Sequence, residues 1–146
     1  MPRYFTVPQA EKLLPEVKRH LEDALFQKSE YQSAIDELEA VVARIRSSGG
    51  AQVDPAAMRR MKSQRDGSIA LLQAAMEAID ELGAQVKDLD TGLIDFLTMY
   101  ENREVCLCWK LGEDGIEFWH GTEEGFRGRK KIDPEFLAAH RGDGLH

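Results

Sequence analysis

A heptad repeat in the first third of the chain constrains the fold more than any other feature. Apolar side chains fill two positions of the repeat from Leu14 to Ile45, and Lys28 is the one polar residue among them. A spacing of about 3.5 residues indicates a helix that packs along its length against another helix. The two positions hold Leu14, Leu21, Lys28, Ile35 and Val42 and, in the second row, Val17, Ala24, Tyr31, Leu38 and Ile45.

The beginning of this helix carries two local signals. Thr6 and Gln9 have the spacing of a capping box, in which each side chain bonds the backbone N–H of the other residue. Pro15 lies inside the apolar pattern, where a proline removes one helix hydrogen bond. We therefore expect a helix over about residues 7–46, with either a short first helix or a kink near Leu14.

A second helix follows a glycine-rich turn at Ser47–Gly50. Asp54-Pro55 reads as a cap followed by proline at the first helical position, and Gly83 is a natural stop, so this helix covers about residues 54–82. Two helices of similar length joined by a short loop make an antiparallel, coiled-coil-like hairpin. The seam of the second helix is weaker in its first half, where Arg65 and Ser68 are polar, and it consists of Met58, Met61, Arg65, Ser68, Leu72, Ala75, Ile79 and Leu82.

A two-helix hairpin buries little apolar surface on its own. A second hairpin from another copy would complete a four-helix bundle, and this homodimer is the arrangement we favour. The alternative is a monomer in which a small β-module covers the seam.

After Gly83 the apolar pattern changes to a period of two, which is typical of strands. The segments Glu104–Lys110 and Ile116–His120 predict a hairpin, with Glu113–Gly115 as a three-residue loop that contains a glycine bulge. Asp133-Pro134 caps a short last helix. The predicted fold is α+β and mainly α: a helical hairpin over residues 1–84, then residues 85–146 as an antiparallel β-module with a C-terminal helix.

The charge pattern excludes some functions. The net charge of -7 argues against nucleic-acid binding, which needs a positive surface. Acidic residues are concentrated between Ala70 and Glu124, a segment that contains thirteen acidic residues and three basic ones. A short basic run follows at once, and it either neutralises this acidic surface within the fold or binds an anion.

The chain reads as a cytoplasmic protein that does not enter the membrane. The N-terminal stretch lacks the apolar core of a signal peptide, and no apolar run approaches the ~20 residues that span a bilayer. A disulfide between Cys106 and Cys108, two residues apart on one strand, would be strained. A reducing compartment fits best.

The predicted hairpin gathers candidate metal ligands. With the expected loop, Cys108 pairs with His120, and one face of the hairpin carries Cys106, Cys108 and His120, with Asp95 as a possible fourth ligand. A two-residue turn would instead place His120 opposite Leu107. The plainer interpretation is that the two thiols are apolar fillers of the core.

Two further interpretations use acidic residues. Oxygen ligands for a divalent ion such as magnesium or manganese could come from Asp88, Asp90 and Asp95 with Glu117, His120, Glu123 and Glu124. His120 could also act as a general base beside Glu117 or Glu124. A solvated acidic turn explains the same residues without a metal.

The basic run from Gly125 to Lys131 could bind a phosphate or carboxylate, or a protein partner. The residues proposed for this role are Arg127, Arg129 and Lys130, with Trp119 nearby in the sequence. The phosphate-binding and catalytic motifs of common enzyme families are absent.

Three stretches resemble one known family: YFTVPQAEKLLPEV, VKDLDTGLIDF and REVCLCWKLGEDGIEFWHGTEEGFRGRKKI. Over Tyr4 to Ile132 the chain is similar to the bacterial domain of unknown function 2203. The resemblance implies no activity. It marks Cys108-Trp109, Trp119-His120 and Gly125–Arg129 as family features, whereas the position of Cys106 is commonly aliphatic there.

Two functional hypotheses follow. The first is a cytosolic interaction or scaffold module that forms a homodimer through its hairpin and docks a protein partner with its β-module. The alternative is a small metal-dependent or anion-binding enzyme with His120 as base or ligand.

Overall fold

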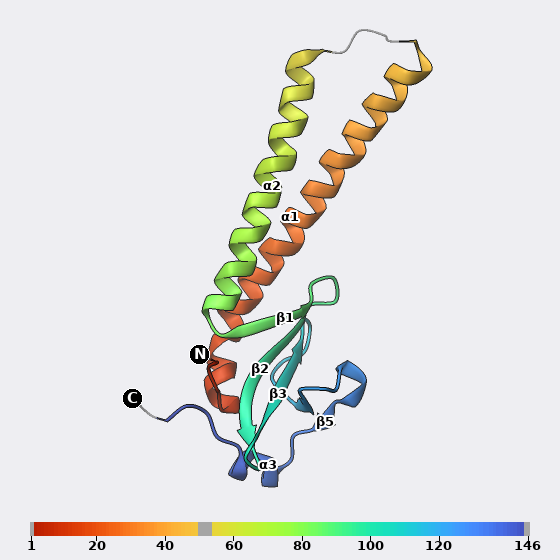
Figure 1. Cartoon of the computed structure of the whole chain (residues 1–146). Coiled ribbons are helices and arrows are strands. Elements are labelled where there is room, and N and C mark those ends of the chain that lie inside the picture. The colour runs from red at the N-terminus through yellow and green to blue at the C-terminus, as the bar shows by residue number, and fades with distance from the viewer. Residues whose placement is uncertain (1, 50–53, 145–146) are drawn as a thin grey trace. The chain divides into compact units, whose positions relative to one another are not determined.

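The computed structural model describes residues 2–49 and 54–144. Within these ranges the chain forms three α-helices and one five-stranded antiparallel sheet (Figure 1). This confirms the predicted α+β fold, with a helical hairpin, a small sheet and a short last helix. The elements are α1 (Val7–Ser47), α2 (Pro55–Glu81), β1 (Ala84–Asp88), β2 (Leu93–Tyr100), β3 (Arg103–Lys110), β4 (Phe118–Gly121), the 3-10 helix η1 (Phe126–Gly128), β5 (Lys130–Lys131) and α3 (Pro134–Ala139).

The chain divides into two compact units. The sheet unit contains the residues up to Leu21 and those from Glu77 onward, and the hairpin unit is Glu22–Met76. Both long helices therefore contribute to both units. The predicted division into a helical hairpin over residues 1–84 and a β-module over residues 85–146 stays a prediction.

The capping box at the start of α1 is confirmed. The Thr6 N–H donates to Oε1 of Gln9 at 2.9 Å, and the Gln9 N–H donates to Oγ1 of Thr6 at 3.3 Å. The next free N–H, that of Val7, donates to Nε2 of the buried His140 at 2.9 Å. Side chains from both ends of the sequence thus satisfy the first turn of α1.

The prediction of a short first helix is wrong, because α1 runs without interruption through Pro15. Leu14, Val17 and Leu21 are buried on one side of the helix, and Pro15 lies exposed on the other. The ring therefore faces solvent, where water can bond the carbonyl that the proline leaves without a donor. Burial of the neighbouring apolar residues holds the segment helical.

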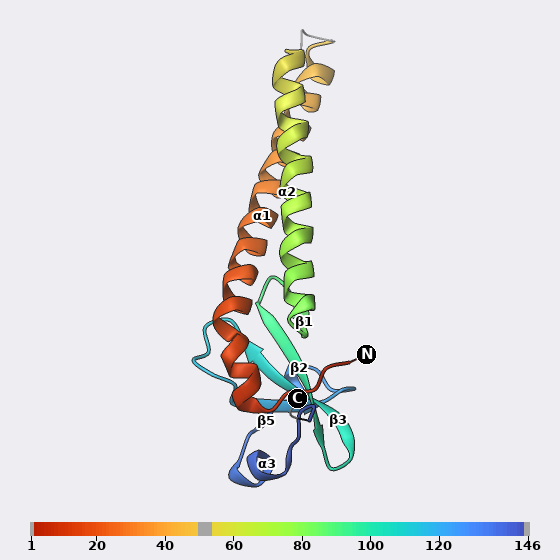
Figure 2. The same cartoon turned by 90° about the vertical axis from the view of Figure 1, so that its left-hand side faces the viewer.

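The hairpin unit consists of two antiparallel helical stretches, Glu22–Ser47 of α1 and Pro55–Met76 of α2, and Figures 1 and 2 show them running side by side. The Asp54 carboxylate accepts the Ala56 N–H at 2.9 Å, as the predicted cap requires. The predicted turn at Ser47–Gly50 begins at the end of α1, and Gly50 with residues 51–53 lies outside the described residues.

The sheet is a meander in which each strand pairs with the next along the chain. The β1–β2 turn covers residues 89–92, in agreement with the predicted turn at Asp90-Thr91-Gly92. Between β2 and β3, Glu101 and Asn102 have φ values of 53° and 61°. Two residues with positive φ make the tight turn that matches the twist of paired strands.

The predicted loop between β3 and β4 is wrong. The connection is residues 111–117, and Gly112, not Gly115, has a positive φ, of 104°. Glu113 folds back onto β3, where its Oε1 accepts the Lys110 N–H at 2.7 Å and its carbonyl accepts the Trp109 indole N–H at 3.0 Å. Strand β4 begins only after this folded segment, at Phe118.

The strand register moves with the longer loop. His120 pairs with Cys106 and Phe118 pairs with Cys108, whereas the sequence predicted Cys108 opposite His120. This is a shift of two residues, and an even shift leaves each side chain on its predicted face. Cys106, Cys108 and His120 therefore share one face of the sheet, as expected.

The opposite face of the sheet carries the main core. Phe96 and Leu107 are fully buried there, and Figure 2 shows the first turns of α1 beside the strands. The ring of Phe5 meets that of Phe96 edge-on with 5.4 Å between centroids. Trp119 stacks on Phe136 of α3 with 5.0 Å between centroids, which fixes α3 to this face.

None of the helices within residues 2–49 and 54–144 combines the length and the apolar character that crossing a membrane requires.

Substitution of two glycines tests the backbone conformation at the end of α2 against that of its interior. Gly83 has a φ of 93°, and a Cβ there would lie 2.6 Å from Cζ of Phe5. Gly67 lies inside α2, and a Cβ there would meet nothing within 4 Å. We expect Gly83→Ala to lower the free energy of unfolding by about 1–3 kcal/mol through strain. Gly67→Ala should raise it by about 1 kcal/mol through helix propensity.

Urea denaturation of the two variants beside the wild type measures both effects. An unchanged midpoint for Gly83→Ala would contradict the left-handed stop at the end of α2.

Candidate functional site

The three central strands bring a carboxylate, a thiol and an imidazole together. β3 lies between β2 and β4; Asp95 of β2 pairs with Cys108, and His120 of β4 pairs with Cys106. Asp95 and His120 therefore lie on either side of β3, opposite two residues that are two positions apart, and both side chains point to the same face of the sheet. One ligand atom from each of Asp95, Cys106 and His120 lies within 4.8 Å of the others.

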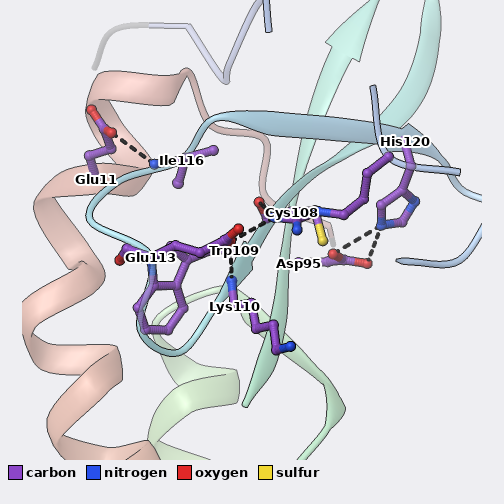
Figure 3. Close-up of polar contacts among 9 residues, drawn as sticks. Glu11, Asp95, Cys108, Trp109, Lys110, Glu113, Ile116 and His120 are labelled. Atoms are coloured by element: carbon purple, nitrogen blue, oxygen red, sulfur yellow. Dashed lines mark hydrogen bonds and ion pairs between the residues drawn. The ribbon is translucent and has the colours of Figure 1, made fainter. Parts of the chain in front are cut away.

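Both ring nitrogens of His120 face acceptors. Nε2 lies 3.1 Å from Oδ1 and 3.1 Å from Oδ2 of Asp95, a contact visible in Figure 3. Nδ1 lies 2.7 Å from the backbone oxygen of Gly121. A carbonyl oxygen can only accept, so a hydrogen bond to Gly121 requires a hydrogen on Nδ1.

The cluster is closed to solvent. The exposed fractions of Asp95, Cys106 and His120 are 1%, 3% and 4%, and Cys108 is fully buried. Burial, and after it the charge of Asp95, raises the pKa of Cys106 and of Cys108 to about 12. Both cysteines are free thiols and stay protonated at neutral pH.

Arg129 covers the strand beside this cluster. Its guanidinium lies 4.0 Å from the ring centroid of Phe118 and 4.7 Å from that of Phe126, and it donates to Oε1 of Glu113 at 2.6 Å. The side chain is 10% exposed. A cation held between two rings and a carboxylate closes the sheet face at this point.

The structure brings together some of the predicted metal ligands and separates others. Asp95 and His120 are in contact, and Cys108 lies directly opposite Asp95 (Figure 3). Asp90 lies in the exposed β1–β2 turn, where its N–H bonds the Asp88 carboxylate at 3.0 Å. Glu117 is exposed in the loop before β4. The predicted pairing of Glu117 with His120 is therefore not what holds the imidazole.

The basic run bonds mainly to acids of its own unit. Lys130 donates to Oε1 of Glu124 at 2.7 Å and lies 4.8 Å from the ring centroid of Trp119. This hydrogen bond, with a second from the Gly121 N–H, lowers the pKa of Glu124. Arg127 is exposed on η1. A role for this run in binding an anion or a partner stays a prediction.

Some residues that shape the site were not predicted. Glu11 of α1 accepts the Ile116 N–H through Oε2 at 3.0 Å and so holds the loop before β4 (Figure 3). Glu113 was predicted as an ordinary loop residue, yet it bonds both β3 and Arg129. No local pattern marks these contacts, because Glu11 and Ile116 are 105 residues apart.

A groove of about 590 Å³ lies in the sheet unit, but it does not lead to the imidazole. Its lining is Glu11, Leu14, Pro15, Lys18, Trp109, Gly112, Glu113 and Asp114. His120 is enclosed, and each of its ring nitrogens lies against an oxygen atom.

The fold and cluster define a class of protein with a long helical hairpin, a five-stranded meander and an enclosed Asp–His–Cys group. Residues 3–132 match the family described as "Uncharacterized conserved protein (DUF2203)", and the chain belongs to this family. The resemblance stated from the sequence is confirmed, while a bacterial origin stays a prediction. Comparisons with curated proteins and with solved structures found no match.

The buried thiols predict a stability that falls in alkaline solution. The ordinary pKa of each thiol is 9.0 and the folded value is about 12. Above pH 9 the unfolded chain binds fewer protons than the folded chain, so the free energy of unfolding decreases as pH rises. At pH 10 we expect a loss of about 1.4 kcal/mol for each thiol.

Urea denaturation at pH 8 and pH 10 measures this loss. A Cys106→Ala/Cys108→Ala double variant is the control, and it should lose about 2–3 kcal/mol less than the wild type between the two pH values. Equal losses would show that the thiols ionise as freely in the folded protein as in the unfolded chain.

Proposed function

We propose that this protein is an interaction module that forms a homodimer through its hairpin unit. The observation that carries the proposal is the size of the side chains that this unit buries. In the described residues of Glu22–Met76, the buried side chains are all small: Ala24, Ala34, Ser68 and Ala75. Two helices in contact leave most of each apolar seam uncovered.

The larger apolar residues of the same unit are half-buried or exposed. Phe26, Val42 and Leu71 are exposed, and Ile35, Leu38 and Ile45 of the predicted seam are half-buried. A groove of about 690 Å³ opens between the helices near their connection, and Val41, Ile45, Met58 and Met61 supply its apolar lining. Apolar surface of this kind is typical of a helix-packing interface.

Charges along the unit support a second copy of the chain as the occupant. The part near the connection, residues 37–65, has six basic residues and three acidic residues. The remaining part, residues 22–36 and 66–76, has five acidic residues and one basic residue. Two copies that lie antiparallel place the basic part of each against the acidic part of the other.

This arrangement makes a four-helix bundle of two hairpins related by a twofold axis. Both copies use the same surface, so the interface closes and does not extend into a filament. A parallel pair would set like charges against each other, which is unfavourable. The β-module of each copy is then free to dock a protein partner through Trp119, Arg127 and Lys130, as the sequence predicts.

We also infer a cytosolic location, because the two free thiols suit a reducing compartment. The alternative function, a small metal-dependent or anion-binding enzyme centred on His120, has support from the Asp95–His120 contact. The enclosed imidazole favours the interaction module over this enzyme.

A charge placed on the groove tests the dimer. Ile45 is half-buried and lines the groove, whereas Ala43 is exposed and does not. Ile45→Glu would bury one unpaired carboxylate from each copy, so we expect the dimer dissociation constant to rise at least about tenfold. Ala43→Glu adds the same charge on the outer surface and should change this constant by less than about threefold.

Sedimentation equilibrium measures these constants. A wild-type chain that stays monomeric at tens of micromolar would contradict the proposal, as would equal effects of the two substitutions. Spin labels on Ala43→Cys test the orientation, because an antiparallel pair separates them by about 25 Å along the bundle and a parallel pair sets them close together.

A further inference from the structure

The geometry points to a binding site for one zinc-class divalent cation, held by Asp95, Cys106 and His120 inside the sheet. This inference concerns the sheet unit and does not depend on self-association. The three residues come from β2, β3 and β4, and one ligand atom of each lies within 4.8 Å of the other two. A set of one nitrogen, one sulfur and carboxylate oxygen is a set that zinc accepts.

The hydrogen bonds of His120 are the strongest argument. Nδ1 lies 2.7 Å from the Gly121 carbonyl and Nε2 lies 3.1 Å from the Asp95 carboxylate. With the hydrogen on Nδ1, the lone pair of Nε2 points at that carboxylate. A lone pair and a carboxylate that face each other repel unless a positive charge lies between them. A metal ion bound by Nε2 and by the Asp95 carboxylate supplies such a charge.

Metal-binding histidines in proteins show the same outer arrangement. Such a histidine usually donates its second N–H to a carbonyl or carboxylate, which fixes the ring and strengthens the ligand. Gly121 has this role for His120. The arrangement requires no change in β4, since the carbonyl belongs to the residue directly after the imidazole.

The spacing of the ligand atoms is close to what a tetrahedral ion needs. Bonds of the usual lengths place neighbouring ligand atoms roughly 3.3–3.8 Å apart. Nε2 of His120 lies 3.1 Å from both oxygens of Asp95, so this carboxylate can supply one or both oxygens. Since the atoms lie within 4.8 Å of each other, a movement of about 1 Å completes the set.

Burial indicates a structural site. Asp95, Cys106 and His120 are nearly inaccessible, and the groove of the sheet unit has none of them in its lining. Structural zinc sites are closed, whereas catalytic ones keep a position open for water or substrate. The ion would cross-link three strands of the sheet, and it would enter during folding or a local opening of the sheet.

Cys108 provides a matched control. It lies on the same strand and face as Cys106 and is equally buried, and its thiol adjoins the Asp95 carboxylate. Its sulfur does not belong to the group of mutually close ligand atoms. Cys106→Ser and Cys108→Ser are therefore the same chemical change at two buried positions, of which one is a proposed ligand.

The test uses the full chain, unfolded in guanidinium with a thiol-free reductant and refolded at pH 8 with cobalt(II) or zinc. The wild type should bind one ion per chain and show the near-ultraviolet charge-transfer absorption of a cobalt–thiolate bond. Zinc should displace the cobalt and raise the melting temperature. Cys106→Ser should lose this absorption and the zinc-induced rise, while Cys108→Ser keeps both.

Several results would overturn the site. One is a refolded wild type, with native circular dichroism, that takes up neither ion in stoichiometric amount. Another is a cobalt–thiolate absorption that persists in Cys106→Ser or is lost equally in Cys108→Ser. If Cys106→Ser does not fold, Cys106→Val takes its place, because a branched apolar side chain suits a buried strand position. Cobalt–thiolate absorption that is unchanged in that variant would also overturn the proposal.

Discussion

The sheet depends on one buried contact, that between His120 of β4 and Asp95 of β2. A carboxylate and an imidazole removed from water are tolerated only when they are paired. They can meet only if the β2–β3 and β3–β4 registers are both correct, because β3 lies between them. A slip of one residue in either pair would send one partner to the opposite face and leave the other buried and unpaired.

The long elements of the fold were predictable because their signals are local and periodic. The heptads, the Thr6–Gln9 capping box and the glycine at position 83 lie within a few residues of the structure that they specify. The β3–β4 loop was not predictable in this way, because Glu11 bonds Ile116 from 105 residues away. The error in the predicted loop did not change which residues share the face of the candidate site, because the strand register changed by an even number of residues.

Pro15 shows the same contrast between local and tertiary effects. Propensity alone indicates a helix break, yet burial of Leu14, Val17 and Leu21 keeps α1 continuous. In the hairpin unit the local pattern is present, but the packing within one chain does not satisfy it. The larger apolar residues of the heptads stay half-buried or exposed. A second copy of the chain would satisfy the pattern that this unit leaves incomplete.

The tautomer of His120 tests the account most directly. Long-range proton–nitrogen correlation spectra of metal-free protein labelled at histidine nitrogens, assigned by comparison with His120→Gln, report which nitrogen carries hydrogen. Nδ1 lies 2.7 Å from the Gly121 carbonyl, which can only accept, so we expect the hydrogen on Nδ1. A neutral ring with its hydrogen on Nε2 and none on Nδ1 would contradict the hydrogen bond from Nδ1 to the Gly121 carbonyl, from which the cation site is argued.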